Sequence, residues 1–570
     1  MDPQVYTLPP QIIIPGTEMT WMQFEYQCVL GSLRNQPEPK IRDQAELLFS
    51  KMLAAQLKDR IFLFLCSPQL LNQPANLRAV AGALCKRKLL LWRTFPFNDL
   101  PVEIVVDIFR YAIWSTLGSP EGILSRFHLT WVCRRWRHIA VLDQTLWNTI
   151  LFRDLKIGYA QSILFFQRAG TATLDLRIED NEKTRVKPDK PMTADDMQRL
   201  MDILTTKSSQ IRMFIAVVEM WPPVLVLLDR LHKSSRSLQQ LERIEIHRTG
   251  RPYRWDGPDY PLSDYQHALA LCDGRTRRVN FICLNGIHLD WEKCRLANLT
   301  TLDLRRMPPH LGPSLERFRE MLKSSPNLRK LCLDGAGPVE PPGRGANPYA
   351  PVFLPRLESF IVGDVFAKYA AFCAGTIHAP NVCEVTLLNL VGEDHTPLIK
   401  ALTGKFPELL MVTLHALCVP KSPQNAKVMA EWLLSIPKVR FMRMTKMKPH
   451  LFANFFVDGR LHLRDDIPHI VTLEESKAIL GNGPIILCPQ LEAIEVQHID
   501  HGSAINFAYG RAKDGVPLRR LYAHKEWVES LNPHEKAALQ TFGPDLLHVT
   551  RPLTLTPLES EIWNQFGGRP

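Results

Sequence analysis

The stretches "LTTLDL" (299–304) and "LRKLCL" (328–333) decide the fold of this 570-residue chain. Each places apolar residues at its first, fourth and sixth positions. The same pattern returns in "LESFIV" (357–362), "VCEVTL" (382–387), "LLMVTL" (409–414) and "VRFMRM" (439–444), with successive copies starting 29, 29, 25, 27 and 30 residues apart. A short strand with a longer return segment cannot bury its apolar face alone, so stacked copies should share one continuous core.

Further copies extend the array on both sides. They are "IRMFIA" (211–216), "LERIEI" (241–246), "VNFICL" (279–284), "LEAIEV" (491–496) and "LRRLYA" (518–523), with helix-like segments at 312–325 and 422–436 between copies. The array resembles leucine-rich repeats, which have an LxxLxL core at this period. It predicts an α/β solenoid over residues 171–530, with 531–570 as a C-terminal cap or tail. The Asn or Cys that usually follows each strand is mostly missing, so we expect irregular turns.

The alternation of side chains along each strand assigns the faces of the predicted sheet. The repeated apolar residues face the core, and the residues between them face the concave surface. Arginine and aromatic side chains are enriched at protein interfaces, and arginine pairs with carboxylates and phosphates. We therefore expect a protein substrate, including an acidic or phosphorylated one, on this surface. The alternative is that the face is solvated or covered by insertions at 248–265, 334–352 and 447–488. The candidate substrate-binding residues are Arg243, His247, Phe281, Arg305, Lys330, Met411, His415, Phe441, Arg443, Arg520 and Tyr522.

Residues 96–150 predict a separate helical unit. "LPVEIVVDIFRYAIW" (100–114) is helical in pattern, "STLGSPEG" (115–122) carries turn residues, and "ILSRFHLTWVCRRWRHIAVL" (123–142) predicts one longer helix. A unit this small has more large apolar residues than its own core needs. The excess indicates a surface kept for a partner.

This unit resembles an F-box, through its "LPxEIxxxIF" opening, its "VCRRWRHIA" helix and its closing "LW". The long loop after Trp114 is similar to that of many fungal members. In that family the helices bind the Skp-type adaptor of a cullin–RING ubiquitin ligase. The resemblance implies that the contact is made by Leu100, Pro101, Ile104, Ile108, Val132, Cys133 and Trp136. The alternative is that these residues fill a small helical core.

Residues 17–93 predict two helical hairpins, after a disordered N-terminus at 1–16. "LGSLRNQPEPKIRDQAE" (30–46) and "LRAVAGALCKRKLLLW" (77–92) resemble the N-terminal HEAT repeats of importin-β transport receptors. That resemblance implies binding of the Ran GTPase or of nucleoporins. The alternative is a helical cap, because two such repeats are too few to be stable alone. The expected fold class is therefore mainly α over about 150 residues, followed by the α/β solenoid.

Composition and missing motifs limit the function. The net charge of +11 is spread along the chain, which argues against a nucleic-acid interface. No apolar run is long enough to span a membrane, and no secretory signal is evident. Scattered cysteines in such a chain indicate a cytoplasmic or nuclear protein. No phosphate-binding loop, dinucleotide motif or nucleophile elbow is present, so we expect no active site, cofactor or metal.

The leading interpretation is a non-catalytic substrate receptor of an SCF-type ubiquitin ligase. Residues 96–150 would hold the adaptor, and the repeat surface would hold the substrate. Two alternatives stay open: a transport adaptor that works through residues 17–93, and a repeat scaffold without ubiquitin function.

Overall fold

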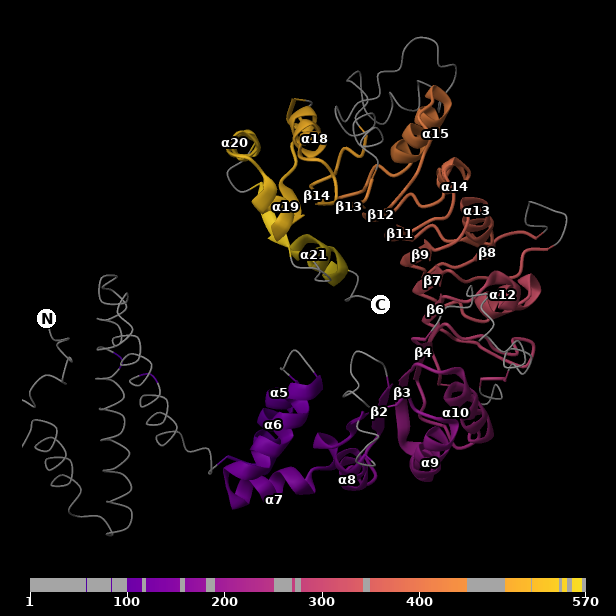
Figure 1. Cartoon of the computed structure of the whole chain (residues 1–570), viewed down its shortest axis with the longest axis vertical. Helices are drawn as coiled ribbons and strands as arrows, with labels where there is room; N and C mark the ends of the chain where they lie inside the picture. Colours follow the sequence, from indigo (N-terminus) through magenta and orange to yellow (C-terminus); the bar gives the residue numbers. More distant parts are fainter. Residues whose placement is uncertain are drawn as a thin grey trace, which may run out of the picture. The chain divides into compact units, whose positions relative to one another are not determined.

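The fold is described from a computed structural model (Figure 1). The chain divides into two compact units, Met1–Val141 and Leu142–Pro570. Apart from Lys58 and Leu84, the predicted HEAT-like hairpins at 17–93 lie outside the described residues, as does the expected disordered segment at 1–16. The described residues are Lys58, Leu84, 100–114, 119–153, 159–180, 190–250, 269–271, 278–341, 349–447, 487–513, 515–542, 546–550 and 556–565.

The described part of the first unit is helical. It comprises α5 (Val102–Trp114), α6 (Ser119–Val132) and nearly all of α7 (Arg134–Leu142). The expectation of one helix over 123–142 is wrong, because the chain leaves the helix at Cys133. The amide of Trp136 donates a hydrogen bond to the Cys133 Sγ at 3.4 Å, so this thiol caps the start of α7. The expected turn is also shorter, since α6 already begins at Ser119.

The core of these helices is made by one face of α5. Val105, Phe109 and Ile113 are almost fully buried there. The Phe109 ring packs against the Trp136 ring of α7, with centroids 4.9 Å apart. The Arg135 guanidinium donates to the Leu100 carbonyl at 3.0 Å, which ties the start of α7 to the start of α5.

The second unit is built on a curved parallel sheet (Figure 1). In the described residues the sheet has fourteen strands that pair in chain order, and β8 (Val352–Phe353) pairs separately with β10 (Ile377–His378). The strands of the main sheet are β1 (Thr149–Phe152), β2 (Leu174–Asp180), β3 (Ile211–Val218), β4 (Arg243–Arg248), β5 (Phe281–Asn285), β6 (Thr301–Arg305), β7 (Lys330–Asp334), β9 (Ser359–Gly363), β11 (Glu384–Leu388), β12 (Met411–His415), β13 (Phe441–Thr445), β14 (Ala493–Gln497), β15 (Arg520–His524) and β16 (Leu547–Thr550).

Every predicted repeat position holds one of these strands. The expectation of a helical N-terminal region followed by an α/β solenoid-like sheet is therefore confirmed, while the finer assignment to leucine-rich repeats stays a prediction. The structure adds β1, β2 and β16, none of which coincides with a predicted repeat copy. From β4 to β14 the strands pair without a register shift, so equivalent residues of successive repeats lie side by side.

Helices cover the outer side of the sheet, as Figure 1 shows for α12–α15 and α18. The apolar residues of the strands, such as Leu302, Leu331 and Val412, are buried on this side. No helix in the described ranges is both long and apolar enough to span a bilayer. The remaining helices are η2 (Gln144–Leu146), α8 (Ala160–Arg168), α9 (Ala194–Leu204), η4 (Thr205–Gln210), α10 (Trp221–Lys233), η5 (Pro309–Leu311), α12 (Leu315–Lys323), α13 (Ala367–Gly375), α14 (Thr396–Leu402), α15 (Pro423–Leu434), α18 (His501–Lys513), α19 (Lys525–Ser530), α20 (Pro533–Thr541) and α21 (Pro557–Gln565).

The turn after each central strand is regular, which corrects the expectation of irregular turns. The residue that directly follows each main-sheet strand from β5 to β14 has a positive φ. Its amide extends the hydrogen-bond ladder to the next strand in seven of the eight turns, from Gly286 to Lys446. Two of these residues are glycines and the others carry side chains. The conformation therefore comes from the ladder rather than from an Asn or Cys motif. These residues are Gly286, Arg306, Gly335, Asp364, Asn389, Ala416, Lys446 and His498.

Candidate functional site

The concave face of the sheet is crossed by straight rows of side chains, because the strands pair residue for residue. One row runs Glu245, Cys283, Asp303, Cys332 and then Ile361 on successive strands. Neighbouring strands lie about 4.8 Å apart, so adjacent members of a row are within interaction distance. Polar residues of this face can therefore form networks across the repeats.

The part of this face over β4–β7 is accessible, and the predicted residues lie together there. The side chains of Arg243 and Arg305 are 43% and 36% exposed. The Arg243 guanidinium stacks over the Phe281 ring, 3.8 Å from its centroid. Arg305 donates two hydrogen bonds to the Asp303 carboxylate, at 2.6 and 2.7 Å, and Lys330 lies 4.0 Å from the same group. The cations are thus partly neutralised by the sheet itself.

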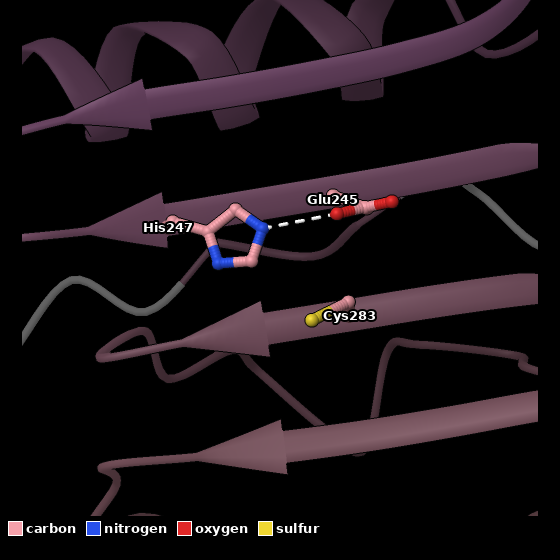
Figure 2. A group of neighbouring side chains, drawn as sticks. All are labelled: Glu245, His247 and Cys283. Atoms are coloured by element: carbon pink, nitrogen blue, oxygen red, sulfur yellow. Dashed lines mark hydrogen bonds and ion pairs between the residues drawn. The ribbon is translucent and has the colours of Figure 1, made fainter. Parts of the chain in front are cut away.

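Figure 2 shows a polar cluster on β4 and β5, formed by Glu245, His247 and Cys283. His247 Nε2 lies 3.1 Å from Glu245, and Arg243 donates to the other carboxylate oxygen at 2.5 Å. Burial acts to raise the pKa of Glu245, but the His247 hydrogen bond and the Arg243 charge outweigh it and hold the pKa low. Burial also raises the pKa of the Cys283 thiol to about 12, with a further contribution from Asp303.

These three donors could in principle bind a transition metal. One atom from each lies within 4.8 Å of the others, and zinc accepts sulfur, imidazole and carboxylate ligands. A metal would have to compete with the Arg243 guanidinium for the Glu245 carboxylate, and it would have to displace the thiol proton. Glu245 is therefore held by hydrogen bonds from Arg243 and His247 on the concave surface, next to a protonated thiol.

The part of the face over β12–β15 is covered by α21, which Figure 1 shows on the inner side of the sheet. Three of the predicted substrate-binding residues are covered in the free chain, because the side chains of Met411, Phe441 and Tyr522 are only 3%, 1% and 2% exposed. They pack in one apolar cluster with Leu558 and Ile562 of α21. Cys383 and Ala493 complete this cluster.

Ion pairs join α21 to the same strands. Arg443 contacts Glu495 of β14 at 2.7 Å and Glu559 of α21 at 2.9 Å. Arg440 contacts Glu492 at 2.6 Å and Glu561 of α21 at 3.3 Å. Burial acts to lower the pKa of Arg443, but the two carboxylates outweigh it and raise the pKa. Arg443 is therefore bound within the chain rather than free for a ligand.

Two predicted residues lie at the margin of the covered part. His415 is half-buried, and burial together with the Lys446 charge lowers its pKa. Arg520 is also half-buried and donates to the Tyr522 hydroxyl at 3.3 Å. Both side chains therefore belong to the border between the open and the covered surface.

Helix α5 is apolar on two sides. Its buried face carries Phe109, whereas Ile104, Ile108 and Tyr111 form a second stripe at i, i+4 and i+7. Ile104 remains 46% exposed and Tyr111 77% exposed. A helix of a small unit that needs only one apolar face for its own core leaves the second face available to a partner.

The next helix adds large apolar side chains to the exposed set. Trp131 is 66% exposed, and Leu124 and Val132 are about half exposed.

The family comparison concerns this part of the chain. Residues 97–153 match the F-box-like family model. The predicted resemblance of residues 96–150 is thereby confirmed, and the matched segment includes β1 of the solenoid sheet.

Two solved structures match the chain distantly. A Bacteroides fragilis protein shares 13% identity over 58% of this chain and 73% of its own, with a TM-score of 0.28. The Rad7–Elc1 complex of yeast matches at 12% identity over 70% of this chain and 92% of its own, with a TM-score of 0.25. No curated protein matches the chain.

The F-box-like segment places most of the predicted adaptor-binding residues at its surface. Pro101, Ile104, Ile108, Val132 and Cys133 are exposed, and Leu100 is half-buried. Trp136 is the exception, because its ring is 8% exposed and packs on Phe109 in the core.

Sequence reasoning missed Val102, Tyr111, Leu124 and Trp131 of the F-box-like segment, all of which are exposed. A signal was available for Tyr111. Apolar residues recur at helical spacing along both faces of α5, so one face had to remain outside the core.

Proposed function

We propose that this chain is a non-catalytic substrate-receptor subunit of an SCF-type ubiquitin ligase. Its F-box-like segment would bind a Skp-type adaptor, and the concave sheet surface would bind a protein substrate. Catalysis would then be by proximity, because holding the substrate near the ligase's transfer enzyme raises its effective concentration there.

The observation that carries this proposal is the exposed apolar face of α5 and α6 within the segment that matches the F-box-like family. Burying one large aliphatic side chain contributes about 1.5–3 kcal/mol. Several such side chains on one partner surface are enough to support a specific interface. The transport alternative falls on residues 17–93, and no described feature favours it.

The test is co-purification of the full chain with a Skp-type adaptor. We expect the wild type to retain the adaptor, and Ile104→Asp with Ile108→Asp to reduce retention by about tenfold or more. Phe366→Asp is the matched control, because Phe366 is an exposed apolar residue of the second unit. The proposal fails if folded wild type retains no adaptor, or if the control variant loses it equally.

A further inference from the structure

We propose that the concave face of β12–β15 is a binding site for an acidic amphipathic helix, and that α21 occupies this site in the free chain. The inference rests on the proposed function for one point, the identification of the incoming helix as part of a substrate. The site itself is argued from the contacts of α21.

The apolar half of the recognition is visible in those contacts. Leu558 and Ile562 are four residues apart, so they lie on one face of α21. Both are buried, in one cluster with Met411, Phe441 and Tyr522 of three different strands. A helix that presents two aliphatic residues at i and i+4 to an apolar surface is a recurrent mode of peptide recognition.

The charge of the ligand is set by Arg443. Its guanidinium contacts Glu559 of α21 at 2.9 Å, and the Glu559 side chain is only 5% exposed. Glu559 also accepts a hydrogen bond from the Thr556 amide, so one carboxylate both caps the helix and pairs with the sheet. A basic residue at this position would face Arg443 in a poorly solvated site, which disfavours basic helices. The pair between Arg440 and Glu561 is more exposed and contributes less.

Helix α21 can be replaced because it is short. Nine residues do not form a stable helix in isolation, so α21 depends on the surface that it covers. It follows β16 closely in the chain and therefore binds as an intramolecular ligand, with an effective concentration of about millimolar.

An external ligand can make contacts with the open part of the concave face, which α21 does not reach. The rows of the concave face continue in register from β12 back to β4, where Arg243 and Arg305 remain partly exposed. A substrate that spans both parts of the face would bury more surface than α21 does. It could thus compete with the covalently attached helix.

The experiment measures binding in trans by fluorescence anisotropy. The probe is a labelled synthetic peptide of residues 554–567, and the protein is the full chain. We expect Leu558→Asp with Ile562→Asp to release α21, so that this variant binds the peptide about tenfold or more tighter than the wild type. Glu559→Lys should release α21 with a smaller change to the chain. It replaces the double variant if circular dichroism shows that the double variant is unfolded.

Two controls test whether the site requires an acidic helix. A peptide with lysine in place of both Glu559 and Glu561 should bind the released chain about tenfold more weakly. In the released background, Arg443→Glu should weaken binding of the natural peptide, and Lys323→Glu, at an exposed position on the outer helix α12, should leave it unchanged. The proposal is overturned if a folded released variant binds no peptide, if the wild type binds equally well, or if the Arg443 and Lys323 variants lose binding equally.

The same variants are assayed for adaptor retention, which keeps the two proposals separate. Retained adaptor without peptide binding overturns only the helix site. Peptide binding without adaptor supports the helix site and overturns the ligase assignment.

Discussion

Ala416 illustrates how the repeat constrains a single residue. It follows β12 with a φ of 54°, a region that costs a residue with a Cβ about 1–2 kcal/mol. Its amide donates to the Thr445 carbonyl at 2.8 Å, so the ladder imposes the conformation. The equivalent position after β7 is Gly335, which adopts the same conformation without that cost.

We therefore expect Ala416→Gly to stabilise the protein. The free energy of unfolding should rise by about 0.5–1 kcal/mol, because the relief of backbone strain exceeds the added entropy of the unfolded chain. Gly335→Ala should lower it by about 1 kcal/mol, since alanine is strained at φ 62°. Urea unfolding followed by circular dichroism measures both, and equal signs for the two changes would contradict the argument.

His288 makes stability depend on pH. It is buried and stacks on Trp221 with ring centroids 4.9 Å apart. Burial lowers its pKa to about 4, with smaller contributions from the Arg248 and His310 charges. The unfolded chain binds this proton near pH 6.5, so protonation favours unfolding. The contribution of His288 to stability should fall by about 1.4 kcal/mol per pH unit between pH 6.5 and 4, and should stay constant below pH 4.

The measurement compares the pH dependence of unfolding in the wild type and in His288→Phe. Phenylalanine can keep the ring stack but cannot bind a proton. The slope between pH 6.5 and 4 should be shallower in the variant. An unchanged slope would show that His288 does not carry this dependence.

At the scale of elements, α5 separates core from surface within one turn. Phe109 is fully buried against Trp136, whereas its neighbour Ile108 belongs to the exposed stripe. Phe109→Ala should therefore destabilise the first unit by about 3–5 kcal/mol, because it leaves a cavity. Ile108→Ala should change stability by less than about 0.5 kcal/mol. Hydrogen exchange of the α5–α7 amides in the full chain measures the effect of each substitution. A comparable loss of protection in the two variants would contradict the assignment of Phe109 to the core and Ile108 to the surface.

The strands were predictable because a short local apolar pattern specifies each of them. An apolar pattern such as that of "LTTLDL" specifies β6 and its buried face without reference to the rest of the chain. The helical break at Cys133 was not predictable in this way, because a thiol cap is a weak signal within an otherwise helical pattern. The positive φ of Ala416 was also not predictable from the local sequence, because it results from hydrogen bonding to the next strand.

The covered surface could not be predicted for a different reason. Leu558 and Ile562 indicate an amphipathic helix, but nothing near them says which surface the helix meets. That information lies in Met411, Phe441 and Tyr522, more than thirty residues upstream and on separate strands. Outward-facing aromatic residues had the composition of an interface, and they do form one, with the chain's own C-terminus.

At the scale of the whole second unit, stability is nearly one-dimensional. Each strand contacts its neighbours, so distant substitutions should have additive effects on unfolding. Helix α21 breaks this rule, because Met411 on β12 and Tyr522 on β15 share its apolar cluster although β13 and β14 lie between them.

A double-mutant cycle tests this coupling. Met411→Ala and Tyr522→Ala should be non-additive by about 0.5–1.5 kcal/mol in urea unfolding. Met411→Ala with Leu331→Ala is the matched control, since β7 is also three strands away from β12 but Leu331 faces the outer core. That pair should add within about 0.5 kcal/mol. Additivity in both pairs would mean that α21 does not connect the strands energetically.

The unshifted register of the sheet also determines which shapes of ligand fit it. Strands follow one another about every 4.8 Å, and an α-helix repeats its facing side chains about every 5.4 Å. A helix laid across the strands therefore meets close to one strand per turn. An extended peptide laid the same way repeats its facing side chains about every 6.6 Å and loses step within two strands. The difference of about 0.6 Å per step keeps a helix within half a strand spacing over about four strands. The concave face is thus periodically matched to short helical ligands, both where α21 lies and in the part that α21 leaves open.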